Sequence, residues 1–158
     1  MKQTIRGLEI SPRQTGKTTR MVTKARELLD GGITVRFVCS KGMKACFKRL
    51  LPGATVLDDG EGLPPGDDPD LGVWFYDEFE SLKSAVLRPN AYYASSPRFM
   101  RMLGQPPGDD MLLQLLEANG GCFERIYWAF DVTEYLREVR LAYTPEEFRR
   151  LYLGEFLR

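Results

Sequence analysis

The sequence predicts an α/β fold with a mainly parallel sheet flanked by helices. Two observations favour this fold class. Short runs of β-branched and aromatic residues alternate with amphipathic stretches of helical length, and glycine or proline closes several of these stretches. The acidic, Gly/Pro-rich segment 58–70 interrupts the alternation and is expected to be a loop. No internal repeat is present, so residues 1–158 are expected to form a single domain.

Each expected element follows from a local pattern. Strands are predicted where β-branched and aromatic residues cluster, at residues 7–11, 33–40, 54–57, 72–78, 90–98 and 125–132. Helices are predicted where apolar residues recur at helical spacing, at residues 17–29, 43–51, 81–87, 111–119 and 144–157. The first helix is ended by Gly31 and Gly32. The last begins after Thr144, an N-cap residue, with Pro145 in the first helical position.

The composition excludes several kinds of chemistry. The 22 basic and 22 acidic residues cancel, so the overall charge predicts no nucleic-acid partner, and such a partner would need a local basic patch. No apolar run is long enough to span a membrane. The absence of histidine excludes Ser-His-Asp triads and HExxH zinc sites. The three cysteines match no zinc spacing and are expected to be free thiols in a reducing compartment.

The stretch SPRQTGKTT, residues 11–19, joins the first expected strand to the first expected helix. A helix N-terminus has free N–H groups and the positive end of the helix dipole, so an anion can bind there. Gly16 lets the backbone approach phosphates, Lys17 can reach the β and γ phosphates, and the Thr18 hydroxyl is placed to ligate Mg²⁺. Ser11 replaces the first glycine of the strict phosphate-loop pattern, which leaves a basic helix start as the alternative. The flanking strand and helix favour the phosphate loop.

Two further strand ends carry polar residues. The run VWFYDEFE contains Asp77, which can hold the water shell of Mg²⁺, and Glu78, which can deprotonate water for attack on a γ-phosphate. The alternative is a buried strand with a solvated acidic end. In AYYASSPR, Ser95 and Ser96 end a strand, where small hydroxyl residues can sense a γ-phosphate. Taken alone, an ordinary strand followed by a Ser-Pro turn explains this third motif better.

Together the three motifs resemble, in order, the ATPase domain of phage terminase large subunits, the motors that package viral DNA. That family has a deviant Walker A phosphate loop, a Walker B strand ending in Asp-Glu and a Ser/Thr-Pro coupling motif. The C-terminal EEFRRLYLGEF also looks like the helix that closes that domain. The resemblance implies a P-loop NTPase of the terminase or RecA-like type that binds ATP and Mg²⁺. The nucleotide-binding residues that it implies are Ser11, Pro12, Arg13, Gln14, Thr15, Gly16, Lys17, Thr18 and Thr19.

The resemblance also implies a role for each residue that matches a family motif. These are metal binding by Thr18 and Asp77, catalysis by the carboxylate Glu78 and the cis arginine Arg13, and coupling of hydrolysis to motion by Ser95 and Ser96. Three arginines flank the coupling strand, and any one could act as an arginine finger across a subunit interface, namely Arg88, Arg98 and Arg101. The aromatic pairs Tyr92-Tyr93 and Tyr127-Trp128 are expected to serve the core. The basic residues of KGMKACFKR are expected to form a solvated helix face, with a DNA-facing surface as the alternative.

By this resemblance, the protein is expected to be an ATP hydrolase that couples hydrolysis to translocation of double-stranded DNA. Expected partners are DNA, further copies in a homo-oligomeric ring on a portal, and a separate nuclease or small terminase subunit. The expected location is the cytoplasm, of an infected host cell if the protein is viral, with no membrane partner. Alternatives are a nucleotide-binding regulatory module with little turnover and a small nucleotide kinase.

The sequence also departs from the family pattern. Terminase ATPase domains are considerably longer. Only ten residues precede Ser11 here, and Gln3 is a poor substitute for the usual adenine-contacting segment. The chain ends at Arg158, without the carboxylate-rich nuclease domain of the family. The expectation is therefore a minimal ATPase that works with a separate nuclease, or a relative with another use.

Overall fold

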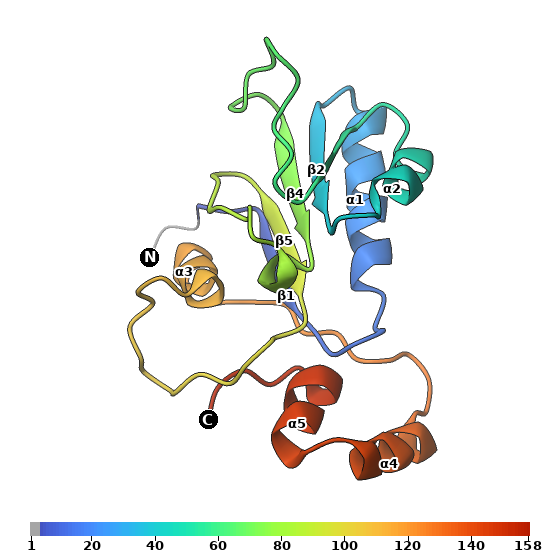
Figure 1. Ribbon diagram of the computed structural model, residues 1–158, viewed down its shortest axis with the longest axis vertical. Coiled ribbons are helices and arrows are strands. Elements are labelled where there is room, and N and C mark those ends of the chain that lie inside the picture. The colour runs from blue at the N-terminus through green and yellow to red at the C-terminus, as the bar shows by residue number, and fades with distance from the viewer. Residues whose placement is uncertain (1–3) are drawn as a thin grey trace.

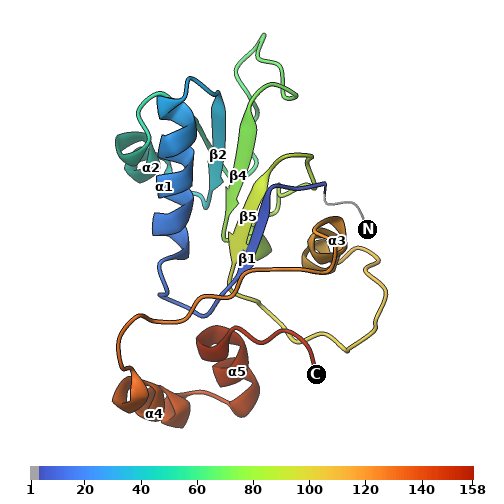
Figure 2. The ribbon, with the colours of Figure 1, turned by 180° about the vertical axis from the view of Figure 1, so that it is seen from behind.

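The computed structural model describes residues 4–158 and has helices on both faces of one sheet (Figure 1). One face is covered by α1 (Lys17–Asp30) and α2 (Lys44–Leu50), and the other by α3 (Met111–Ala118). The last two helices, α4 (Thr133–Ala142) and α5 (Pro145–Leu153), lie beyond the edge at which the strands end, as the view from behind also shows (Figure 2). The predicted α/β class is confirmed. Among the described residues no helix is long and apolar enough to cross a membrane.

The sheet has five strands, all parallel, as the sequence predicted for most of them. Their order across the sheet is β1 (Gly7–Ile10), β5 (Tyr92–Ser95), β4 (Val73–Asp77), β2 (Val35–Cys39) and β3 (Thr55–Asp58). The carboxyl ends of parallel strands meet at one edge of a sheet. Since β5 lies between β1 and β4, the residues that follow these three strands are neighbours at that edge.

Apolar side chains fill both faces of the sheet, as expected for parallel strands covered by helices. On the α1 face, Phe37 and Phe75 stack with ring centroids 5.9 Å apart and pack in the same cluster as residues of α1 and α2. On the α3 face, Tyr76 and Tyr93 stack at 5.1 Å in a second cluster, which contains Leu112 of α3. Because the central strands are fixed from both sides, the positions of their carboxyl ends are fixed as well.

The predicted strand at residues 125–132 is wrong. The backbone pairs with β1 only at Glu124, which donates its N–H to Leu8 O at 2.9 Å and accepts one from Ile10 at 2.8 Å. Because β1 ends at Ile10, the following residues have no further strand to pair with. Ile126 instead donates its N–H to the Ser11 hydroxyl at 2.9 Å. The chain then leaves the sheet edge and forms α4, a helix that the sequence analysis did not predict.

The predicted helix at residues 81–87 is also wrong, because only a short 3₁₀ turn, η1 (Phe79–Ser81), forms there. The carboxylate of Asp59 accepts the N–H groups of Lys83 at 2.9 Å and Ser84 at 2.8 Å. This contact with a residue 24 positions before Lys83 in the chain holds the backbone of Lys83 and Ser84 against the loop after β3.

The start of α5 is as predicted, and its end comes earlier. Thr144 accepts the N–H of Glu147 at 3.2 Å and donates its own N–H to the Glu147 carboxylate at 3.1 Å, which forms a capping box. The helix stops at Leu153 because Gly154 adopts a left-handed conformation, with φ of 69°. A Cβ at this glycine would lie 3.0 Å from Pro12 N. This close approach seats the end of α5 against the loop after β1.

Candidate functional site

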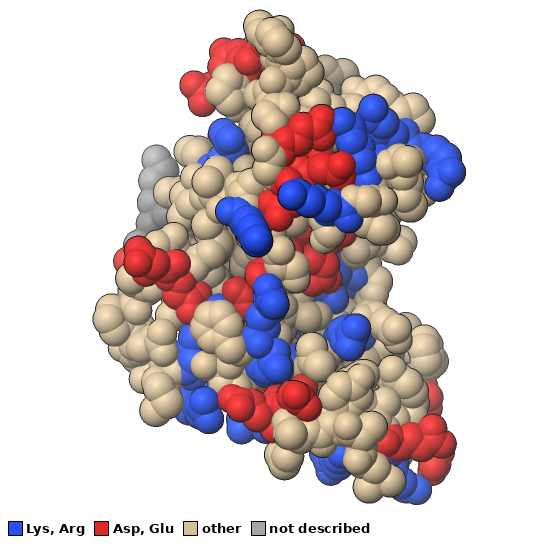
Figure 3. Space-filling view, viewed as in Figure 1, with Lys and Arg blue, Asp and Glu red and all other residues tan. Residues whose placement is uncertain are grey.

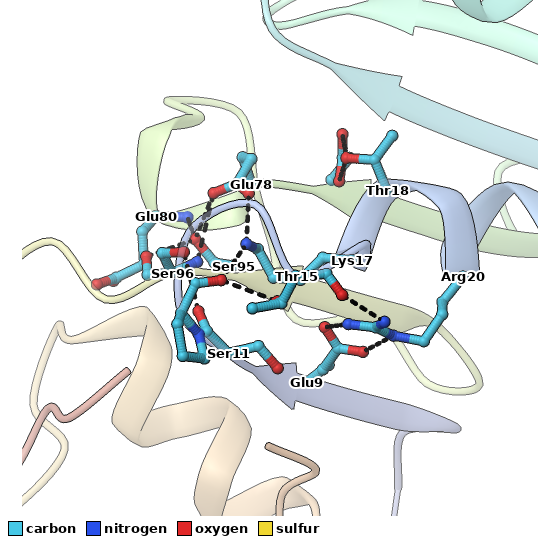
Figure 4. A network of polar contacts seen from close by, with 12 residues as sticks. Glu9, Ser11, Thr15, Lys17, Thr18, Arg20, Glu78, Glu80, Ser95 and Ser96 are labelled. Atoms are coloured by element: carbon cyan, nitrogen blue, oxygen red, sulfur yellow. Dashed lines mark hydrogen bonds and ion pairs between the residues drawn. The ribbon is translucent and has the colours of Figure 1, made fainter. Parts of the chain in front are cut away.

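The structure brings together the three polar segments identified in the sequence (Figure 4). The loop of residues 11–16, here called the β1–α1 loop, follows β1 directly. Ser95 ends β5 and Ser96 follows it, while Asp77 ends β4 and Glu78 follows it. Hydrogen bonds join the segments. The Ser96 hydroxyl donates to Ser11 O at 2.9 Å, and the Ser96 N–H donates to Glu78 Oε2 at 3.3 Å.

The β1–α1 loop is folded tightly on itself. Gly16 is the N-cap residue of α1 and takes a left-handed conformation with φ of 87°, which glycine adopts without strain. The Thr15 hydroxyl donates to Pro12 O at 2.9 Å, and Arg20 donates to Thr15 O at 2.6 Å. The first N–H groups of a helix have no acceptor within the helix, which is why helix N-termini can bind anions.

The Lys17 side chain folds back onto this loop. It is buried, and Nζ donates to Pro12 O at 3.0 Å. The same Nζ forms an ion pair with Glu78 Oε1 at 3.4 Å. Figure 4 shows the two side chains pointing toward each other, with Ser95 and Ser96 beside them. The cation is therefore held at the convergence of the three segments instead of extending into solvent.

Thr18 and Asp77 meet on the other side of Lys17. The Thr18 hydroxyl lies 3.1 Å from both carboxylate oxygens of Asp77, although the two residues are 59 positions apart. Burial, followed by the nearby negative charge of Glu78, raises the pKa of Asp77 to about 6. The described residues contain no group of three or more acidic, Cys or His side chains that could hold a metal ion. A hydroxyl and one carboxylate nevertheless suit Mg²⁺, which usually keeps several waters and binds one or two carboxylates together with substrate phosphates.

Glu78 has an unusual backbone. It adopts the left-handed region with φ of 51°, a conformation that costs a non-glycine residue free energy and that clusters at functional sites. Its Oε2 lies 3.3 Å from both the Ser95 hydroxyl and the Ser96 N–H, and its side chain is 36% exposed. The carboxylate is therefore held by β5 and remains accessible to solvent.

A cavity of about 620 Å³ is lined by Lys17, Glu78 and Ser96, among other residues. It is called the basic cavity here because four cationic side chains and a single carboxylate, Glu78, line it. The cations are Arg13, Lys17, Arg98 and Arg150. The excess of positive charge is local, since the whole chain has no net charge. Such a cavity attracts a polyanion.

The three arginines that flank β5 lie in three different environments. Arg98 lines the basic cavity and is exposed. Arg101 is fully buried and pairs with Glu80 and Asp110, so it cannot reach a second chain. Arg88 packs over the ring of Trp74 and donates to the Tyr76 hydroxyl at 2.8 Å, in a different cavity. Of these three arginines, Arg98 is therefore the one that remains a candidate to act across a subunit interface.

Two contributors to the site were not identified from the sequence. The first is α5, which supplies Arg150 and Leu151 to the basic cavity. No local pattern links a helix near the C-terminus to a loop near the N-terminus. The second is the bidentate ion pair between Arg20 and Glu9, at 2.7 and 3.0 Å, which braces the loop through the Thr15 contact. Glu9 and Arg20 lie in different elements, and no local pattern identifies them as partners.

The remaining predicted residues divide between core and surface. Tyr93 is buried and Tyr92 packs against the core, as predicted, but Tyr127 is 51% exposed. Gln3 lies outside the described residues. Basic side chains gather over α2 (Figure 3). Lys48 is exposed there, and Lys44 pairs with Glu61, as on a solvated helix face.

Comparisons with protein-family models, with curated proteins and with solved structures found no match to this chain.

Proposed function

We propose that the protein is a P-loop NTPase that hydrolyses ATP with Mg²⁺. The observation that carries the proposal is the contact between the Thr18 hydroxyl and the Asp77 carboxylate, directly beside the Lys17–Glu78 ion pair. A lysine, a hydroxyl and an Asp-Glu pair at one sheet edge are the groups that phosphate binding, Mg²⁺ binding and water activation require. If the acidic end of β4 were merely solvated, no contact between it and the start of α1 would be expected.

Thr18 and Asp77 would hold Mg²⁺, which would neutralise charge on the phosphates when bound. Lys17 would exchange Pro12 O and Glu78 for phosphate oxygens, since a phosphate chain bears more negative charge than one carboxylate and a carbonyl bears none. Glu78 would then be free to accept a proton from the attacking water. Ser95 and Ser96 contact Glu78, and Ser96 also contacts Ser11 O, so a change at the carboxylate can pass into β5 and the loop.

The proposed biological role is translocation of double-stranded DNA by a terminase-type packaging motor. Support for this step comes from the order of the three motifs and from the basic surface over α2, which could face DNA. The ring of further copies on a portal and the separate nuclease belong to the same proposal. A kinase is the less suitable alternative, because a kinase must keep water away from the γ-phosphate and Glu78 is accessible.

The test is the rate of phosphate release from Mg·ATP by the wild type and by Glu78→Gln. The variant keeps the shape of the side chain and removes the base, so turnover should fall by roughly 10²–10⁴-fold while ATP binding persists. Glu134→Gln, on the exposed face of α4, is the control and should leave turnover unchanged. Turnover that survives in Glu78→Gln would contradict the assigned role.

Addition of double-stranded DNA separates the motor from the alternatives. A motor should hydrolyse ATP faster with DNA. ATP binding with negligible turnover in both conditions would indicate the regulatory module, and transfer of phosphate to a nucleoside monophosphate would indicate the kinase.

A further inference from the structure

Arg150 is a cation of the basic cavity that comes from outside the three motifs. It lies on α5, and its guanidinium donates to two backbone carbonyls, Pro97 O at 3.3 Å and Arg98 O. Both carbonyls belong to the segment directly after Ser95 and Ser96. Among the described residues no carboxylate forms an ion pair with Arg150, whereas its neighbour Arg149 pairs with Glu155. The charge of Arg150 is therefore satisfied only by neutral acceptors.

Helix α5 is attached to both walls of the basic cavity. On the loop side, Arg13 donates its N–H to Leu151 O at 2.6 Å. On the β5 side, the chain after α5 pairs with Arg101, which donates its N–H to Phe156 O at 2.7 Å. A change in the contacts of Arg150 would therefore act on an element that touches both the β1–α1 loop and the segment after β5.

A phosphate in the cavity would compete with the two carbonyls for the guanidinium. Arginine binds phosphate through paired hydrogen bonds in which both partners are charged, whereas the carbonyls are neutral acceptors, so phosphate is the stronger partner. Lys17 and Glu78, beside which the proposed function places the γ-phosphate, line the same cavity as Arg150. The terminal phosphate of a triphosphate is therefore the one that would meet Arg150.

We propose that Arg150 contacts the terminal phosphate of a bound nucleoside triphosphate and thereby reports its presence to α5 and to residues 97–98. This inference rests on the proposed function. With a triphosphate bound, Arg150 leaves the carbonyls of Pro97 and Arg98 and holds the phosphate. With a diphosphate, it returns to these carbonyls. The hydrogen bonds between α5 and the segment after β5 then differ between the two nucleotide states.

The experiment compares binding of Mg·ADP and of a non-hydrolysable Mg·ATP analogue by calorimetry. Arg150→Ala should weaken the triphosphate about 10- to 100-fold, the value of a hydrogen bond to a charged group, and the diphosphate less than about 3-fold. Arg150→Lys keeps the charge and should restore part of the discrimination. Arg149→Ala removes an arginine that points away from the cavity and should leave both affinities unchanged.

Hydrogen exchange distinguishes contact with the terminal phosphate from a merely structural role of Arg150. In the wild type, exchange at residues 98–101 and in α5 should differ between the triphosphate and diphosphate states, and this difference should vanish in Arg150→Ala. Equal losses for both nucleotides, or an unchanged difference in exchange, would overturn the inference about Arg150 alone. A wild type that binds neither nucleotide would overturn the proposed function, and with it this inference.

Discussion

The buried ion-pair network around Arg101 offers a test with a large expected effect. Its guanidinium binds the Glu80 carboxylate at 2.9 and 3.0 Å and the Asp110 carboxylate at 2.8 and 3.0 Å. The side chains are 1%, 5% and 11% exposed in that order, so water replaces none of these bonds. Arg101→Ala would leave two buried carboxylates without a counter-charge.

The magnitude follows from the cost of breaking a buried pair, which is about 3–5 kcal/mol because an uncompensated charge remains. Two carboxylates lose their partner here, so the upper half of this range is expected. The Asp110 side chain also caps α3 by accepting the Leu113 N–H at 3.2 Å. Domains of this kind have a free energy of unfolding of roughly 5–15 kcal/mol, so the variant should be marginal but measurable.

Urea unfolding, followed by circular dichroism, measures the effect. Arg137→Ala is the control, since its ion pair with Glu134 is exposed and should change the free energy of unfolding by less than about 1 kcal/mol. A cost below about 1 kcal/mol for Arg101→Ala would refute the reasoning.

Three further predictions concern the site. Burial raises the pKa of Asp77 from 3.8 to about 6, so the folded metal-free protein binds this proton more tightly than the unfolded chain and loses stability as the pH rises from about 4 to 6. Asp77→Asn should therefore be more stable than the wild type by roughly 3 kcal/mol at pH 7 in a chelator, as measured by urea unfolding, and should lose Mg²⁺ dependence; equal stabilities would contradict this. Gly154→Ala places a Cβ 3.0 Å from Pro12 N, so it should destabilise the protein more than Gly108→Ala, where φ is also positive but the space is open. Thermal unfolding of the two variants measures the difference. Equal losses of stability would mean that the contact between Gly154 and Pro12 is loose. If the ATPase acts as a ring, specific activity should rise with protein concentration, and Arg98→Ala should flatten that rise by more than it weakens ATP binding to the single chain; activity linear in enzyme for the wild type would argue that one chain completes the site.

The fold was predictable where the sequence carries local signals. The parallel strands and the helices of the first half follow from β-branched runs closed by glycine or proline, and the Thr144 cap follows from short-range chemistry. The errors occur where distant partners decide. The run 125–132 has the composition of a strand, but β1 ends at Ile10 and leaves it unpaired after Glu124. The backbone of Lys83 and Ser84 is held by Asp59, a residue of a distant loop, and this contact is not visible in the local pattern of residues 81–87.

The candidate site divides in the same way. Its three motifs could be identified because each occupies consecutive residues at a strand end. Their meeting could also be expected, since parallel strands end at one edge. Arg150 could not be found, because its place in the cavity depends on how α5 docks on Pro12 through Gly154, a contact between chain segments about 140 residues apart.

The most direct test of the central claim is calorimetric titration of the protein with Mg·ATP. Lys17 is buried between Pro12 O and Glu78, at the place where the proposal puts a phosphate. The wild type should bind Mg·ATP, and Lys17→Ala should abolish the binding while circular dichroism shows an intact fold. Lys24→Ala, which removes an exposed lysine of α1 that pairs with Glu27, should bind as the wild type does. Unchanged affinity in Lys17→Ala, or no binding by the wild type, would contradict the account.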